Sequence, residues 1–198
     1  MIEWLGPVPP GNFMPGRNGM QIRMIVDHWV GIGSFADAAA WFRNPASGVS
    51  AHYLIRADGV FGQLVHDENT AYHAGDWAVN IKSIGIEHET TPDLAPTDAL
   101  YQASADLHRM LAEKYGFPLI VGQTVKPHRA IVPTQCPGTL DLDRIVREAT
   151  MSVTQQEFEE YKRALQAQLE AVNAQLAATE RARIAAALRK AADELDNV

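Results

Sequence analysis

The 198-residue sequence contains a single cysteine, Cys136, so an internal disulfide is excluded. It has no run of roughly 18 apolar residues, the length that a helix needs to cross a bilayer. Positive charge is also scarce, because 17 lysines and arginines face 24 acidic residues and the formal net charge is −7. A nucleic-acid footprint needs clustered positive charge. We therefore expect neither a nucleic-acid partner nor insertion into a membrane.

The N-terminus lacks the basic start and the apolar stretch of a secretory signal peptide. We therefore expect synthesis and folding in a cytoplasm, with delivery by another factor if the substrate lies outside. With 46% hydrophobic and 21% charged residues, the composition is that of a soluble protein that buries a core. The length fits one domain of about 150 residues with an appendage.

Strand and helix signals alternate through the first 150 residues. Residues 1–21 are rich in proline and glycine and predict ordered coil. The patterns predict strands at 22–29, 49–55, 60–65, 83–89 and 119–121, and helices at 35–42, 97–115 and 140–147. The Asp58-Gly59 pair indicates a hairpin between the second and third strands. Residues 1–150 should thus form an α/β domain with a mixed central β-sheet flanked by helices.

The composition changes near residue 154, and from there to residue 198 no glycine or proline occurs. Apolar residues recur mostly at steps of three or four, which predicts a nearly straight helix with one apolar stripe. Such a helix cannot bury its stripe against itself. We expect residues 151–198 to form a long C-terminal α-helical tail that packs on the domain, stays solvated, or joins chains into a homo-oligomer.

Three residues carry the clearest chemical pattern. His28 ends an apolar strand, while His128 and Cys136 lie beside prolines that fix turns. Taken singly, a lone cysteine is most often a small buried hydrophobe, and a strand histidine is usually structural. Taken together, two imidazoles and one thiolate describe a catalytic zinc site with an open position for water. If these side chains converge, the pattern indicates a zinc hydrolase.

The surrounding segments resemble the type 2 zinc-dependent N-acetylmuramoyl-L-alanine amidases, which share their fold with peptidoglycan recognition proteins. The matching segments are 26–29, 49–55, 58–59, 72–75, 80–87, 127–129 and 134–138. Residues 15–19 resemble the start of phage endolysins. The resemblance implies one Zn²⁺ ion bound by His28, His128 and Cys136. It also implies cleavage of the bond between N-acetylmuramic acid and L-alanine of bacterial peptidoglycan, after holin-dependent release from a host cytoplasm.

Two residues are expected to assist the metal. Glu87 lies where related bacterial amidases carry a glutamate, and we expect it to shuttle the proton. Glu89 has the same strand parity and is the nearest alternative for this role. In the other interpretation, Glu87 is only an outward-facing residue of an alternating strand and has no catalytic role. Thr134 stands where some relatives carry lysine, and its hydroxyl could donate one hydrogen bond to the developing oxyanion. Ala51 replaces a tyrosine of some phage amidases, and Tyr53 is expected to be a packed strand residue.

Four further residues are candidates for binding substrate. His73, Trp77 and Asn80 lie in the polar loop 66–82 and are expected to line a peptide cleft, although Trp77 could equally anchor the core. Arg129 either meets an acidic stem peptide or pairs with an internal carboxylate.

Two other functions stay open at this point. One is a non-catalytic peptidoglycan-binding module with the same fold, against which Cys136 argues, because non-catalytic relatives typically replace that ligand. The other is a zinc amidase that acts on soluble muropeptides during wall recycling, which would need neither tail nor delivery.

Overall fold

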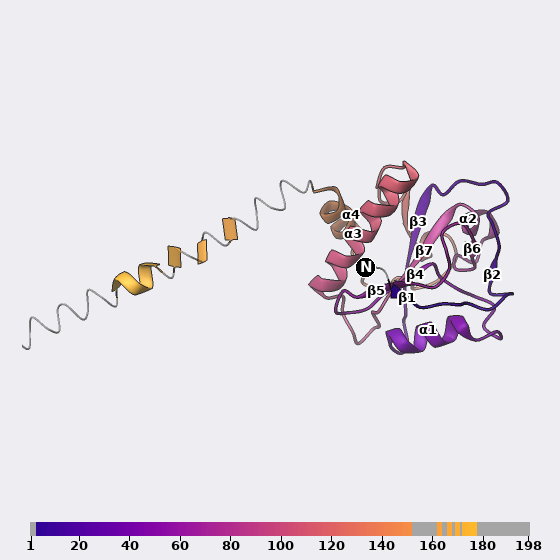
Figure 1. Cartoon of the computed structure of the whole chain (residues 1–198), viewed down its shortest axis with the longest axis horizontal. Helices are drawn as coiled ribbons and strands as arrows, with labels where there is room; N and C mark the ends of the chain where they lie inside the picture. The colour runs from indigo at the N-terminus through magenta and orange to yellow at the C-terminus, as the bar shows by residue number, and fades with distance from the viewer. Residues whose placement is uncertain (1–2, 152–161, 164–165, 168, 171, 178–198) are drawn as a thin grey trace, which may run out of the picture. The chain divides into compact units, whose positions relative to one another are not determined.

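The computed structural model describes residues 3–151 and, in the tail, residues 162–163, 166–167, 169–170 and 172–177 (Figure 1). The chain divides into two units, Met1–Thr150 and Met151–Val198. Among the described residues, no helix is both long and apolar enough to cross a membrane.

A six-stranded mixed sheet forms the centre of the first unit. In spatial order its strands are β1 (Glu3–Trp4), β5 (Phe61–Gln63), β4 (Tyr53–Ile55), β7 (Ser83–His88), β3 (Met24–Trp29) and β8 (Val125–Pro127). The four strands β4, β7, β3 and β8 are parallel, whereas β5 runs antiparallel to β4 and carries β1 at the edge. The predicted α/β class with a mixed sheet is confirmed.

Helices cover both faces of this sheet (Figure 1). One face packs on α3 (Asp98–Tyr115) and α4 (Leu142–Thr150) through a core that includes Ile25, Ile84, Ile86, Leu107, Leu111 and Ile145. The other face packs on α1 (Phe35–Arg43) through a smaller cluster that includes Ala39, Phe42, Leu54 and Leu64. Because side chains alternate along a strand, residues one apart on β3 or β7 serve opposite faces.

The helix ends follow from local chemistry. Ser34 caps α1, and its side chain forms a capping box with Asp37. Thr97 caps α3, and Gly116 ends it in the left-handed conformation with φ of 68°. These two helices match their predicted ranges closely. Helix α4 begins two residues later than predicted and extends to Thr150.

Two sequence-based predictions of local structure are wrong. Residues 1–21 contain β1 and also β2 (Phe13–Met14), which pairs with β6 (Thr70–Ala71) inside the polar loop. The last strand of the sheet is β8 and does not lie at 119–121, where Val121 makes only an isolated bridge. In each case pairing with a distant strand overrides the local pattern.

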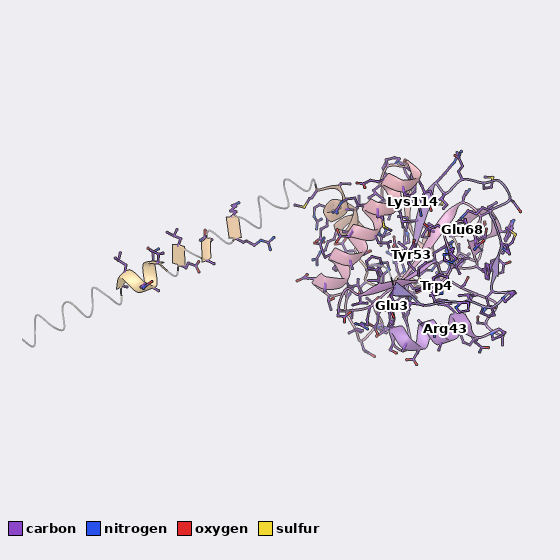
Figure 2. The ribbon with its side chains drawn as sticks, in the orientation of Figure 1. Glu3, Trp4, Arg43, Tyr53, Glu68 and Lys114 are labelled. Atoms are coloured by element: carbon purple, nitrogen blue, oxygen red, sulfur yellow. The ribbon has the colours of Figure 1, made fainter. Side chains whose placement is uncertain are left out.

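The N-terminal segment is held to the domain by a buried arginine. Arg17 is 7% exposed and donates hydrogen bonds to the backbone carbonyls of Asp67 at 2.6 Å and Ser83 at 3.0 Å. The carboxylate of Asp67 in turn accepts from Tyr53 at 2.7 Å and Lys114 at 2.9 Å, both labelled in Figure 2. Tyr53 is therefore a packed strand residue, as expected.

The described tail residues are helical, which agrees with the predicted helix where it can be compared. Leu169, Val172 and Leu176 belong to the predicted apolar stripe, and all three are exposed. The other stripe residues lie outside the described part of the chain.

Candidate metal centre

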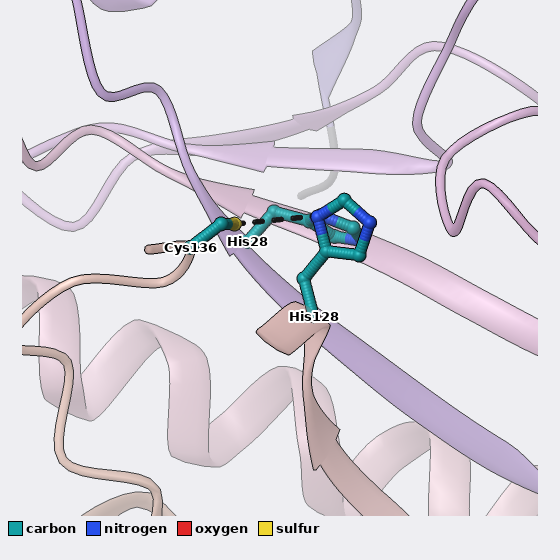
Figure 3. A group of neighbouring side chains, drawn as sticks. All are labelled: His28, His128 and Cys136. Atoms are coloured by element: carbon teal, nitrogen blue, oxygen red, sulfur yellow. Dashed lines mark hydrogen bonds between the residues drawn. The ribbon is translucent and has the colours of Figure 1, made fainter. Parts of the chain in front are cut away.

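Three side chains meet at the carboxyl ends of adjacent parallel strands. His28 lies near the end of β3, His128 begins the short 3-10 helix η1 (His128–Ala130) after β8, and Cys136 lies in the following turn (Figure 3). Their donor atoms all lie within 4.8 Å of one another. The His28 Nδ1 atom is 3.7 Å from the Cys136 sulfur. The fold thus brings the three predicted residues together, although His28 and Cys136 are 108 positions apart in the sequence.

Backbone contacts fix the cysteine in this turn. The Trp29 N–H donates to the Cys136 sulfur at 3.4 Å, and the Arg129 N–H donates to the Cys136 carbonyl at 2.9 Å. Gly138 has a φ of 63°, and a Cβ there would lie 2.3 Å from the Trp29 ring. A glycine is therefore needed at Gly138 for both backbone conformation and packing.

Burial holds the ligand side chains in their uncharged forms. Burial lowers the pKa of His28 well below its usual value, and the nearby His73 and His128 lower it further. The pKa of His128 is also lowered by burial. Burial raises the pKa of Cys136 to about 12, with a further contribution from Glu87. A divalent cation would find neutral imidazoles and would displace the thiol proton on binding.

A cavity of about 530 Å³ opens beside the three donors. Its lining includes the polar side chains of His28, Glu87, His128 and Cys136. It also includes the apolar or aromatic side chains of Ile32, Trp41, Phe42, Val49 and Tyr72. Ile32, Trp41 and Val49 are exposed, Ile32 to 91%. They were missed in the sequence, because an apolar residue on a surface helix or loop needs no functional explanation. The sequence offered one signal for this lining: apolar residues, Ile32 and Val49, lie in the loops on either side of α1.

Glu87 lines this cavity, and its place in the sheet explains why. It pairs in register with His28 on the neighbouring strand, on the same face. Its Oε2 atom is buried without a hydrogen-bond partner among the described residues. Burial raises the pKa of Glu87 to about 8. A buried, unpartnered carboxyl oxygen beside two imidazoles and a thiol fits a site that holds a cation and water.

The alternative carboxylate, Glu89, has a structural role. Its Oε1 accepts from the Phe35 N–H at 2.6 Å, and its Oε2 accepts from the Ala57 N–H at 2.8 Å. Glu89 thus joins the first turn of α1 to the β4–β5 hairpin.

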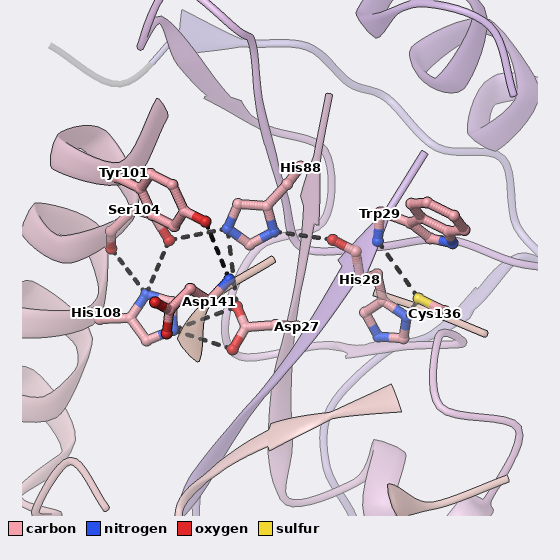
Figure 4. Close-up of polar contacts among 9 residues, drawn as sticks. All are labelled: Asp27, His28, Trp29, His88, Tyr101, Ser104, His108, Cys136 and Asp141. Carbon is pink, nitrogen blue, oxygen red and sulfur yellow. Dashed lines mark hydrogen bonds and ion pairs between the residues drawn. The ribbon is translucent and has the colours of Figure 1, made fainter. Parts of the chain in front are cut away.

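A second polar cluster lies on the other face of the sheet (Figure 4). As expected, His88 points there, and its Nδ1 donates to the His28 carbonyl at 2.9 Å while its Nε2 lies 2.8 Å from the Ser104 hydroxyl. His108 Nε2 lies 3.3 Å from Asp27. These side chains are all fully buried beside α3, and they support β3.

Two residues predicted to bind substrate have their polar atoms engaged within the protein. His73 lines the cavity, but its Nδ1 is 3.1 Å from His28 Nε2 and its Nε2 is 3.1 Å from the Ser83 hydroxyl. Asn80 is 6% exposed, and its Oδ1 accepts from the backbone N–H groups of His73 and Ala74. Asn80 does not line the cavity, contrary to the prediction, because its side chain closes the loop that carries His73.

The other three predicted residues, Trp77, Thr134 and Arg129, lie at the surface and are not among the residues that line the cavity, although Trp77 was expected to line it. Trp77 is exposed at the first residue of α2 (Trp77–Asn80), with its ring centroid 6.2 Å from that of Tyr72. The Thr134 hydroxyl accepts from the Cys136 N–H at 3.2 Å and keeps its own proton available. Arg129 is exposed and donates to the Gly138 carbonyl at 3.2 Å. Their roles stay predictions.

The fold and the site together define an α/β protein with a candidate cation centre at the carboxyl ends of its parallel strands. Residues 18–139 match the family described as N-acetylmuramoyl-L-alanine amidase, and the chain belongs to this family.

Individual relatives are consistent with membership of this family. N-acetylmuramoyl-L-alanine amidase A of Achromobacter lyticus is 35% identical over 113 residues, which are 56% of this chain and 61% of the relative. The 1,6-anhydro-N-acetylmuramyl-L-alanine amidase AmpD of Escherichia coli K12 is 47% identical over 73 residues, or 34% of this chain and 40% of the relative. Both matches span less than two thirds of the relative's length. The solved structure of a mutant endolysin from Bacillus subtilis shares the fold, with a TM-score of 0.62 at 24% identity, covering 75% of this chain and 98% of that chain.

Proposed function

We propose that this chain hydrolyses the amide bond between N-acetylmuramic acid and L-alanine in bacterial peptidoglycan, with one Zn²⁺ ion held by His28, His128 and Cys136. The observation that carries the proposal is the Glu87 carboxyl, which lies in the same cavity as the three donors and has one oxygen unpartnered. Membership of the amidase family supports the choice of bond.

The residues divide the chemical work. A zinc ion would supply Lewis acidity and lower the pKa of water towards about 7. Glu87 would accept a proton from the attacking water and return it to the leaving amine. Thr134 keeps a hydroxyl proton with which to stabilise the oxyanion. The apolar lining residues Ile32, Trp41 and Val49 would contact the methyl groups of the lactyl and N-acetyl substituents.

Incubation with purified sacculi, with and without a chelator, tests the reaction. We expect new lactyl ends on muramic acid and new L-alanine amino termini, both lost with chelator and restored by zinc. Binding to sacculi without release of amino groups would instead support a non-catalytic module.

We also propose that the physiological substrate is the intact wall, reached from a host cytoplasm after holin-dependent release, as for an endolysin. The similarity of residues 15–19 to endolysin starts supports this. The match to AmpD, named as acting on a 1,6-anhydro muropeptide, favours a recycling amidase as the second candidate. Comparing turnover on sacculi with turnover on soluble anhydro-muropeptides discriminates them, because an endolysin prefers sacculi.

For the tail, we propose self-association through the stripe that contains Leu169, Val172 and Leu176, which would strengthen wall binding by avidity. Light scattering should give a larger assembly for the full chain than for a chain ending at Ala149. If both are monomeric, the association proposal fails.

A further inference from the structure

Each of the two candidate ligand imidazoles contacts one of two consecutive residues, His73 and Ala74. His28 Nε2 lies 3.1 Å from His73 Nδ1, and His128 Nε2 lies 3.2 Å from the Ala74 carbonyl oxygen. The dipeptide His73-Ala74 thus meets both rings, although His28 lies on β3 and His128 begins η1. Metal-binding histidines usually donate their second N–H to a group that fixes the ring.

The hydrogen-bond partners decide where each proton lies. A carbonyl only accepts, so His128 carries its proton on Nε2 and leaves Nδ1 bare. The Ser83 hydroxyl oxygen is 2.7 Å from the Val79 carbonyl oxygen, and two oxygens at that distance need a proton between them. Ser83 therefore donates to Val79 and accepts from His73 Nε2.

The same assignment of donors and acceptors extends from His73 to the candidate metal site. With its proton on Nε2, His73 has a bare Nδ1 that accepts from His28 Nε2. His28 is thereby held with Nδ1 bare, and Nδ1 is the atom that faces the Cys136 sulfur. A chain of three hydrogen bonds thus runs from the Val79 carbonyl to the first ligand.

The His73-Ala74 dipeptide is itself tightly held. Asn80 Oδ1 accepts from the His73 N–H at 3.2 Å and from the Ala74 N–H at 2.8 Å. The His73 ring lies against the backbone of Gly85 on β7, where a Cβ would come within 2.4 Å of the ring. Gly85 therefore blocks movement of the His73 ring towards the sheet, and the Asn80 hydrogen bonds fix the loop that carries the ring.

We propose that His73 is a positioning residue for the metal centre, which fixes His28 in the tautomer that binds a cation through Nδ1, and that Asn80 positions His73 and Ala74 for this task. This assignment replaces substrate binding for both residues. It rests on the metal site of the proposed function and is independent of which bond the protein cleaves.

Two measurements test the proposal without substrate. In the metal-free full-length protein, ¹⁵N–¹H spectra of the ring nitrogens should show His28 protonated on Nε2. A His28 ring protonated on Nδ1 would overturn the proposal directly, with no variant required.

A matched pair of substitutions tests the same contact through zinc affinity. His73→Asn keeps an acceptor oxygen near the position of Nδ1, whereas His73→Leu keeps the bulk and removes the acceptor. We expect His73→Leu to weaken zinc binding by about 10- to 100-fold and His73→Asn to restore most of that loss. Equal affinity of the folded Leu variant and the unchanged protein, or equal loss in both variants, would overturn the proposal.

A second pair tests the outer end of the chain. Ser83→Ala frees His73 to change tautomer, so part of the zinc affinity should be lost and the His28 ring signals should become mixed. Ser104→Ala removes a buried hydroxyl on the other face of the sheet and should leave zinc affinity unchanged. If zinc binding follows this pattern but sacculi are not cleaved, the proposed function fails and the positioning role stands.

Discussion

The two faces of the central sheet carry two polar clusters that differ in one respect. On the α3 face, Asp27, His88, Ser104 and His108 are fully buried and contact one another or the backbone. On the α1 face, the candidate metal-ligand cluster lines a cavity. Each cluster contains one buried carboxylate oxygen without a hydrogen bond from any described residue, Asp27 Oδ1 on the α3 face and Glu87 Oε2 on the α1 face. Both clusters contain buried histidines with lowered pKa values. Burial and a shifted pKa are therefore not signs of function by themselves; access from the cavity separates the two.

Removing the sulfur ligand should have the largest effect. Cys136→Ala leaves two imidazoles, so we expect loss of bound zinc and a fall of amidase activity to the level of the chelated protein. Metal analysis after dialysis and turnover on sacculi measure this. Zinc retained at full occupancy would contradict the assignment of Cys136 as a ligand.

Substituting the unpartnered carboxyl should separate chemistry from metal binding. Glu87→Gln should keep zinc and lose about 100- to 10,000-fold in turnover, the usual contribution of a general acid–base group. Glu89→Gln is the matched control, because it alters a carboxylate of the same parity whose partners are the Phe35 and Ala57 amides. It should lower thermal stability with little change in turnover. Comparable turnover losses in both variants would remove Glu87 from the mechanism.

Disrupting the closed cluster should affect stability alone. His108→Leu removes the nearer of the two imidazoles beside the buried Asp27 and leaves only His88, whose Nε2 is 3.8 Å away. Removing one partner of a buried charged pair costs about 3 to 5 kcal/mol in the free energy of unfolding. Zinc stoichiometry of the folded variant should stay at one ion per chain. Urea unfolding with metal analysis checks both, and zinc loss from the folded variant would show that the two faces are coupled.

The last prediction concerns the metal-free protein, whose stability should depend on pH. Burial raises the pKa of Glu87 from 4.5 to about 8, so between these values the folded state binds a proton that the unfolded state lacks. Stability from this group is complete below pH 4.5 and is lost as the pH rises towards 8, by up to about 1.4 kcal/mol per pH unit. The buried histidines act in the opposite direction, because their lowered pKa values reduce stability as the pH falls below 6.5.

Unfolding of the chelated protein across this range isolates the Glu87 contribution. The stability difference between Glu87→Gln and the unchanged protein should grow as the pH rises from 4.5 to 8. A constant difference would show that Glu87 titrates normally.

Much of the site was predictable because its determinants are local or periodic. Alternation along a strand predicted that His88 would face away from Glu87, and the turn residues beside Cys136 predicted its rigid setting. The uses of His73 and Asn80 could not be predicted, because their partners are Ser83, His28 and backbone amides that only the folded loop brings near. Strand β8 was missed for a similar reason, since Val125-Lys126-Pro127 lacks a strand pattern and is ordered by pairing with β3.

The buried Arg17 has a practical consequence for anyone trimming this protein. The family match begins at residue 18, so a fragment cut at that boundary would lose the guanidinium that holds the carbonyls of Asp67 and Ser83. Ser83 is also the residue whose hydroxyl contacts His73. A minimal fragment designed from homology alone would thus omit a side chain that supports the candidate metal centre, and its first residue should lie upstream of Arg17.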